Sequence, residues 1–372
     1  MQSLLEKEQS QEIEKDKHNP VAGTSEDKPG NRKYFLRGVL WTTLSLFLGS
    51  LLLAAWFLHY AWSPGPSVEA SSVSVFIPRG TSSKNISELL AEKKLIHDDF
   101  RFLVLVRLMG RSAKLQAGEF SLTTGQSPVD LIIELAQARP VEYNVTIPEG
   151  LNIAEIADIF STGGWVDKSN FIDKAHDTEL IEELGLEGLD SLEGYLFPDT
   201  YRLMKPARSE VEIIKMLVVR SLSVWQRLSD VNRSGLSRHQ VFTLASMIEK
   251  ESGVGEERPV IASVFFNRLQ KKMKLQSDPT VIYGLGSFNG KLTRSDLKTA
   301  TPYNTYTIPA LPPGPICSPG AQALRAVLFP SDTNYLYFVS KNDGTHYFSK
   351  SLQEHNRAVR KFQRSGNSKT GQ

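Results

Sequence analysis

Several features that mark common classes of protein are scarce or absent in this sequence. Its 372 residues include a single cysteine, Cys317, which excludes an internal disulfide framework and a zinc site built from several thiolates. The 43 basic and 41 acidic residues almost balance, so we expect no nucleic-acid partner. Neither an HExxH sequence nor a Walker-type glycine loop occurs, and we therefore expect no metal and no nucleotide cofactor.

Charge is also missing from one long apolar run near the N-terminus. From Gly38 to Trp62 there is no Asp, Glu, Lys or Arg, and about 20 apolar residues suffice to cross the hydrocarbon core of a membrane. Trp41 and Trp56 lie toward opposite ends, as in the aromatic belts of membrane helices. A cleaved signal peptide is the alternative, but its apolar region is shorter and does not follow a polar tail as long as residues 1–37. We therefore predict an uncleaved, single-pass transmembrane helix.

The charges that flank this run predict its orientation. Arg32, Lys33 and Arg37 precede it, whereas residues 63–72 carry only one charge, on Glu69. By the positive-inside rule the N-terminus is cytoplasmic, and the rest of the chain lies outside the cytoplasmic (inner) membrane, in the periplasm or the extracellular space.

Composition divides the chain further. The N-terminal tail is rich in Glu, Lys, Gln and Ser and lacks the apolar content that would offset the entropy lost on ordering, so we expect it to be disordered. A linker rich in proline and serine follows the apolar run. The predicted parts are a cytoplasmic tail (1–37), the transmembrane helix (38–62), the linker (63–72), a small module (73–141), a larger domain (142–363) and a C-terminal tail (364–372).

The small module has an α+β pattern. Val73, Val75 and Ile77 alternate as in a strand and precede a turn and a helical repeat, and further apolar periods predict helices over 99–109 and 128–138 around a strand at 117–122. The module resembles the lysine-motif (LysM) glycan-binding domain. Nothing in the periodicity itself indicates glycan binding, so a spacer module is the alternative.

The larger domain is also predicted to be α+β. Apolar periods and caps indicate helices, and short β-branched and aromatic runs indicate strands. The helices are expected over residues 153–161, 210–228, 237–251 and 259–272, and the strands over 335–340 and 346–348.

The helix over 237–251 carries two candidate acids at its end. Ser237 and Gln240 form a capping box at its start, and Gly253 is expected to close it. One buried face is expected, with Glu249 and Glu251 on its opposite flanks. Apolar surroundings and the negative end of the helix would keep Glu251 protonated, as proton donation to a glycosidic oxygen requires. Two glutamates near a helix end are more often ordinary solvated surface, so the residues alone leave the question open.

Six short blocks of the sequence resemble, in order and spacing, the signature blocks of the MltG (YceG-like) endolytic murein transglycosylases. The blocks are LEGYLFPDTY (192–201), ASMIEKES (245–252), VFFNRL (264–269), LQSDPTVIYG (275–284), YNTY (303–306) and LPPGPICSPG (311–320).

The resemblance implies a site. The catalytic acid would be the second glutamate of the Glu-Lys-Glu-Ser run, Glu251, with Glu249 supporting it. Pro315 and Cys317 stand where the family often has small residues, which puts the shape of that loop in doubt. The other residues implied to line a cleft are Glu193, Tyr195, Asn267, Arg268, Gln276, Asp278, Tyr283, Tyr303, Asn304, Thr305 and Tyr306.

The resemblance also implies a reaction and its partners. Glycan strands of peptidoglycan would be cut internally, without water, at the β-1,4 bond between N-acetylmuramic acid and N-acetylglucosamine, leaving 1,6-anhydro ends and terminating or releasing nascent strands. The protein partners that the resemblance implies are cell-wall synthases. Two alternatives stay open: a hydrolytic muramidase that uses Glu193 or Asp278 as its second carboxylate, and a membrane-anchored glycan-binding scaffold without activity.

Overall fold

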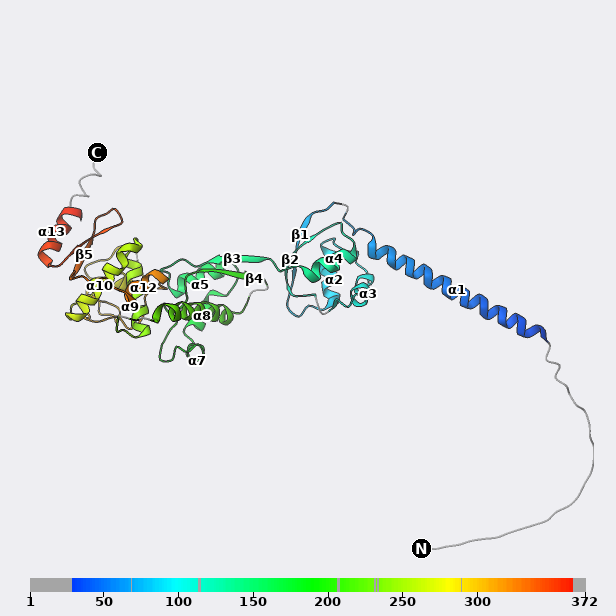
Figure 1. The fold of residues 1–372 in the computed structure, drawn as a ribbon, viewed down its shortest axis with the longest axis horizontal. Coiled ribbons are helices and arrows are strands. Elements are labelled where there is room, and N and C mark those ends of the chain that lie inside the picture. Colours follow the sequence, from blue (N-terminus) through cyan, green and yellow to red (C-terminus); the bar gives the residue numbers. More distant parts are fainter. Residues whose placement is uncertain are drawn as a thin grey trace, which may run out of the picture. The chain divides into compact units, whose positions relative to one another are not determined.

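The computed structural model describes residues 29–363, except residues 68, 113–114, 206–207, 231, 233 and 289. The chain separates after Ser63 into two units. Helices and short antiparallel strands alternate in the second unit (Figure 1), and the described chain is therefore mixed α+β, as predicted. The predicted C-terminal tail lies outside the described residues.

The first unit contains one long helix, α1 (Pro29–Trp62). It begins earlier than the predicted apolar run, so the prediction of disorder is wrong for residues 29–37, and residues 1–28 lie outside the described part. Pro29 suits the first turn of a helix, because its missing N–H would have no partner there. From Tyr34 to Trp62 the helix is long and apolar enough to cross a membrane.

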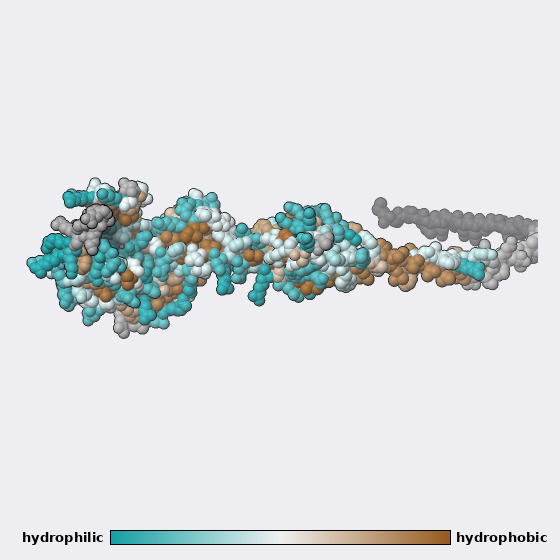
Figure 2. All heavy atoms as spheres, turned by 90° about the horizontal axis from the view of Figure 1, so that it is seen from above, coloured by the Kyte–Doolittle hydropathy of each residue, from teal (hydrophilic) through white to brown (hydrophobic). Residues whose placement is uncertain are grey.

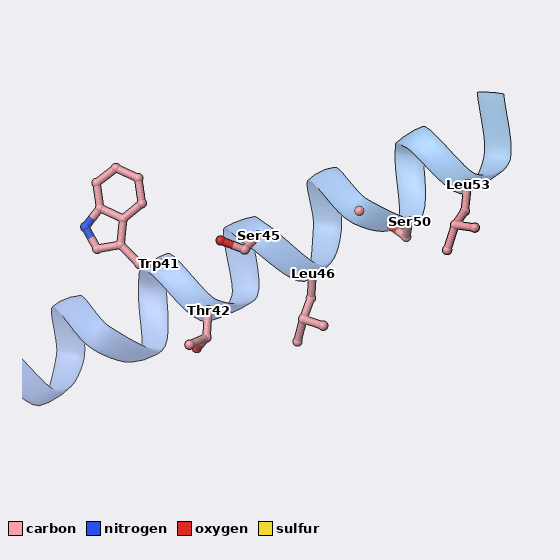
Figure 3. Close-up of a pocket in the computed structure, with 7 residues that line it drawn as sticks. Trp41, Thr42, Ser45, Leu46, Ser50 and Leu53 are labelled. Atoms are coloured by element: carbon pink, nitrogen blue, oxygen red, sulfur yellow. The ribbon is translucent and has the colours of Figure 1, made fainter. Parts of the chain in front are cut away.

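The surface of α1 is that of a lone apolar helix. Apolar side chains cover most of its length (Figure 2). Trp41, Leu46 and Leu53 project from it around a shallow depression formed where Ser45 and Ser50 are small (Figure 3). This depression is open and apolar, and it contains no group that could carry out chemistry.

The second unit begins with the small module. Its strands pair antiparallel, with Val75 opposite Phe120, and both side chains are buried. Their hydrophobic neighbours come from the helices that follow each strand, which gives the module its own core. In chain order its elements are β1 (Ser72–Ile77), α2 (Ser83–Glu92), α3 (Arg101–Leu108), β2 (Gly118–Thr123) and α4 (Pro128–Gln137).

The rest of the unit is mainly helical. The four helices and two strands predicted here are confirmed within two residues at each end. The elements are β3 (Glu142–Thr146), α5 (Ile153–Thr162), α6 (Lys168–Ala175), α7 (Thr178–Glu183), β4 (Thr200–Met204), α8 (Glu210–Ser229), α9 (Arg238–Glu251), the 3-10 turn η2 (Gly255–Glu257), α10 (Arg258–Gln270), α11 (Asp278–Leu285), η3 (Asp296–Lys298), α12 (Ala321–Leu328), β5 (Tyr337–Ser340), β6 (His346–Ser349) and α13 (Leu352–Gln363). The strands form two pairs, β3 with β4 and β5 with β6.

Helix α9 is the central element. Its capping box is confirmed: Ser237 and Gln240 bond reciprocally at the N-terminus. The predicted single buried face is too narrow, because every residue from Val241 to Ile248 is buried. The reason is that α9 packs against α10, α11 and α12, while the N–H of Ile316 in a distant loop donates to Ser246 Oγ at 3.0 Å.

The end of α9 differs from the prediction. Ser252 is extended and caps the helix, and Gly253 does not adopt a left-handed conformation, so the prediction that Gly253 closes the helix is wrong. The chain instead turns into η2 and α10, which bring Arg258 back beside the last turn.

Arg258 and Glu249 hold that last turn. The Glu249 carboxylate accepts from Arg258 Nη2 at 2.6 Å and from the N–H of Gly320 at 3.0 Å. Both side chains are less than a tenth exposed, and Glu149 lies 3.6 Å from the same guanidinium nitrogen. Burial raises the pKa of Glu249, and the Gly320 N–H and Arg258 act in the opposite direction. This cluster joins α9, α10 and two loops.

Removing Glu249 should therefore destabilise the fold. Glu249→Ala leaves the buried Arg258 without its closest carboxylate, which should lower the free energy of unfolding by about 3 kcal/mol. Thermal unfolding of the full chain in detergent micelles measures this. Glu256→Ala, at an exposed neighbouring position, is the matched control and should change stability by less than about 0.5 kcal/mol. Equal stability of the two variants would show that the cluster is not structural.

Candidate active site

A cavity of about 450 Å³ lies at the end of α9. Glu251 enters it from α9, Arg268 from α10, and Asp278 from the start of α11. The hairpin β5–β6 and helix α13 supply the remaining wall. Of the residues predicted for the site, those that line this cavity are Glu251, Arg268, Gln276, Asp278 and Tyr306.

Glu251 occupies an environment that favours its neutral form. Its Oε1 accepts a hydrogen bond from Ser277 Oγ at 2.6 Å. Burial raises the pKa of Glu251, and the negative charge of Asp278 adds to the rise; the Ser277 hydrogen bond, His346 and Arg268 oppose it. Because burial is the largest of these effects, the surroundings favour the protonated carboxyl, which is the form that proton donation requires.

Arg268 and Asn267 mainly hold the cavity wall. Arg268 is buried, donates to the carbonyls of Leu336 at 2.6 Å and Leu275 at 2.7 Å, and lies over the Tyr337 ring. Burial lowers the pKa of Arg268. Asn267 does not line the cavity; its amide donates to the carbonyls of Thr333 and Tyr335. Both side chains tie α10 to the segment that leads into β5.

Gln276 and Asp278 present polar groups to the cavity. Gln276 has φ +52°, a left-handed conformation that costs a residue other than glycine about 1 kcal/mol and that is found often at functional sites. Its N–H donates to the carbonyl of Thr305, which maintains this geometry. Asp278 Oδ1 accepts from the Tyr306 hydroxyl at 2.6 Å, so these two side chains are fixed together at the cavity edge.

Asn304 and Thr305 are buried and lie behind the cavity. The Asn304 amide donates to backbone carbonyls of the preceding turn, among them that of Thr299 at 2.7 Å. Thr305 Oγ1 accepts from the N–H of Ser277 at 2.9 Å. These two side chains therefore position Tyr306 and Ser277. They do not line the cavity in which a ligand would bind.

A second group of predicted residues gathers elsewhere, and none of its members lines the Glu251 cavity. Glu193 is buried and accepts from the N–H groups of Ile153 and Gly194 and from the Tyr283 hydroxyl. Burial raises the pKa of Glu193 to about 7. Tyr195 and Tyr303 complete this group: the Tyr195 hydroxyl lies 3.2 Å from His239 Nδ1, and the Tyr303 ring contacts that of Tyr283.

The loop with Pro315 and Cys317 supports this second group. Cys317 is buried, and its Sγ donates to the carbonyl of Ser246 at 3.3 Å. Gly194 has φ +83°, and a side chain there would come within 2.3 Å of Pro315 Cβ, so this close approach requires glycine. Cys317 thus packs against α9 and Pro315 against Gly194, and neither residue lines the cavity.

Several residues that line the cavity were not predicted from the sequence. Tyr337 and Ser340 come from β5, His346 from β6 and His355 from α13. Their spacing carries no motif, because the hairpin and the last helix reach the cavity only through tertiary packing. Over the described residues, no group of three or more His, Cys, Asp or Glu could hold a metal ion.

Known proteins resemble this chain over most of its length. The model of the YceG-like family matches residues 75–361. The endolytic murein transglycosylase of Bacillus subtilis is 36% identical over 315 residues, which cover 80% of this chain and 87% of that protein. The enzyme of the same name from Streptococcus pneumoniae is 29% identical over 84% of this chain, which spans 63% of the streptococcal protein. The crystal structure of a yceG-like protein from Listeria monocytogenes, 33% identical, matches with a TM-score of 0.54 over 78% of this chain and 100% of that one. The chain therefore belongs to the YceG-like family.

Proposed function

We propose that this chain is an endolytic lytic transglycosylase of peptidoglycan. It cleaves the β-1,4 bond between N-acetylmuramic acid and N-acetylglucosamine within glycan strands and leaves 1,6-anhydro ends, which terminates or releases nascent strands. The observation that carries the proposal is the half-buried Glu251 in a polar cavity, in a chain whose relatives are named endolytic murein transglycosylases.

The mechanism needs one carboxyl group. Glu251 protonates the glycosidic oxygen as the bond to C1 of the muramic acid breaks. The C6 hydroxyl of the same sugar then attacks C1, and in the simplest form the Glu251 carboxylate takes the hydroxyl proton. Because this nucleophile is tethered to the reacting ring, it has the advantage of an intramolecular attack and no water needs to be activated.

The other cavity residues suit a sugar ligand. Gln276, Asp278 and Tyr306 offer amide, carboxylate and hydroxyl groups to sugar hydroxyls, and aromatic rings suit the apolar faces of sugars. A muramidase would need a second carboxylate about 5 to 9.5 Å from the first. Asp278 is the candidate inside the cavity, whereas Glu193 lies outside it.

The remaining parts are proposed to serve this reaction at the membrane. The apolar helix α1 would anchor the chain in the cytoplasmic membrane, with residues 73–141 and 142–363 as two domains outside. The strand, helix, helix, strand order of β1, α2, α3 and β2 supports a LysM-like module that binds glycan. Cell-wall synthases are the protein partners that such an anchored enzyme would meet; a scaffold without activity is the remaining alternative.

Product analysis tests the reaction. Wild-type protein acting on glycan strands in ¹⁸O-labelled water should give unlabelled 1,6-anhydro ends, since no solvent oxygen enters the sugar. Glu251→Gln keeps the shape of the side chain but cannot donate a carboxylic proton, so cleavage should fall at least about 100-fold, as measured by mass spectrometry. Labelled reducing ends would favour the muramidase, and absence of any cleavage would favour the scaffold.

Orientation has its own test. A reporter that is active only outside the cytoplasm, fused after Gln372, should be active because the basic residues Arg32, Lys33 and Arg37 hold the N-terminus inside. Replacing these three with Gln should weaken the preference. An inactive reporter in a well-expressed fusion would contradict the orientation.

A further inference from the structure

The cavity that holds Glu251 contains an imidazole to which the mechanism above gives no role. His346 begins β6 and lines the cavity with Glu251. Its side chain is 12% exposed, so the ring is largely shielded from bulk water while it borders the space in which a ligand would lie.

Glu257 holds His346 from behind. One carboxylate oxygen, Oε1, accepts the backbone N–H of His346 at 3.0 Å, and the other, Oε2, lies 2.7 Å from Nδ1 of the ring. Glu257 is not among the residues that line the cavity. The Phe338 ring meets the imidazole edge-on, with the centroids 5.5 Å apart. The ring is therefore held by its Nδ1 contact with Glu257 and by aromatic contacts with Phe338 and Phe348, while the other Glu257 oxygen holds the backbone of His346.

This arrangement determines which ring nitrogen can act. A carboxylate at Nδ1 favours the tautomer that carries its proton there, so in the neutral ring Nε2 has a lone pair and can accept a proton. Nε2 lies on the ring edge away from Glu257, and no protein group hydrogen-bonds to it in the part of the chain that the structure describes. A carboxylate orients the base in the same way in catalytic triads.

We propose that His346, oriented by Glu257, is the base that receives the proton of the muramoyl C6 hydroxyl; this inference rests on the proposed function. As Glu251 gives its proton to the glycosidic oxygen, the bond from that oxygen to C1 breaks. The C6 oxygen forms its bond to C1 and releases its proton to His346 Nε2. The net result is one proton moved from Glu251 to His346, and exchange with solvent restores both groups before the next turnover.

Separate acid and base give a distinct pH dependence. Cleavage requires Glu251 protonated and His346 neutral, so the rate should fall at high pH as Glu251 ionises and at low pH as His346 is protonated. A single carboxyl in both roles would not produce a low-pH limb from an imidazole. The other titratable or charged groups that line the cavity, from α10, α11, the loop after it, β5 and α13, are Arg268, Asp278, Tyr306, Tyr337 and His355.

The test is the pH profile of kcat/KM for the full chain in micelles, with purified glycan strands as substrate. His346→Asn keeps an N–H that can donate to Glu257 but has no group at the Nε2 position. It should lower the rate at the optimum about 100-fold and abolish the low-pH limb, while the remaining product keeps its 1,6-anhydro ends. Glu257→Gln leaves the ring in place and should lower the rate at least about tenfold with the low-pH limb retained.

Controls separate this inference from the proposed function. His176→Gln, at an exposed position in the cap of α6, should leave rate and profile unchanged. Wild-type rate and profile in His346→Asn would overturn the inference, as would loss of the low-pH limb in His355→Gln with its retention in His346→Asn. Should His346→Asn fail the circular dichroism test of folding, an unchanged rate in Glu257→Gln would overturn it. Absence of anhydro ends from the wild-type protein would instead overturn the proposed function.

Discussion

Helix α9 is buried over eight successive residues, and this burial fixes where the two carboxyl groups of its last turn can go. Glu249 points to the buried cation of Arg258 and to a backbone N–H, so a charge can be compensated there. Glu251 lies two residues further on, and its hydrogen bond comes from the neutral hydroxyl of Ser277. The same helix end thus ties one carboxyl into the fold and presents another to the cavity, where the proposed function needs it.

The electrostatics of the cavity follow from this division. Arg268 lines the same cavity as Glu251 and could neutralise it, but its guanidinium donates to the carbonyls of Leu336 and Leu275. Asp278 adds negative charge, which disfavours ionisation of Glu251 further. Loss of hydration is therefore the dominant influence on the pKa of Glu251, and it favours the protonated form that the proposed role as proton donor requires.

Local patterns in the sequence were enough to predict the helices and strands, but they were not enough to predict the site. Helix limits, the capping box at Ser237 and the apolar run after Gly38 depend on neighbouring residues, and all three are present in the structure. Burial of α9 on every side and the extended Ser252 depend on α10, α12 and a distant loop, so one period of apolar residues could not predict them.

The family blocks predicted many residues of the two clusters, but they did not tell which of these residues line the Glu251 cavity. Glu193 and Tyr283 belong to blocks as specific as that of Glu251, yet they bond to one another outside its cavity. Asn304 is buried against its own turn. His346 and Glu257 stand 89 positions apart, and only the return of β6 beside η2 makes them a pair. Membership of a family block therefore does not tell whether a residue lines the cavity, because that depends on its tertiary contacts.

The central claim is that burial keeps Glu251 protonated at neutral pH. The infrared difference spectrum between wild-type protein and Glu251→Gln at pH 7 measures this directly, because a protonated carboxyl has a carbonyl band that a carboxylate lacks. Glu193 contributes equally to both proteins and cancels. The account predicts that the wild-type protein shows a carboxylic acid band that is lost in the variant. Loss of carboxylate bands in its place would show that Glu251 is ionised and would contradict the account.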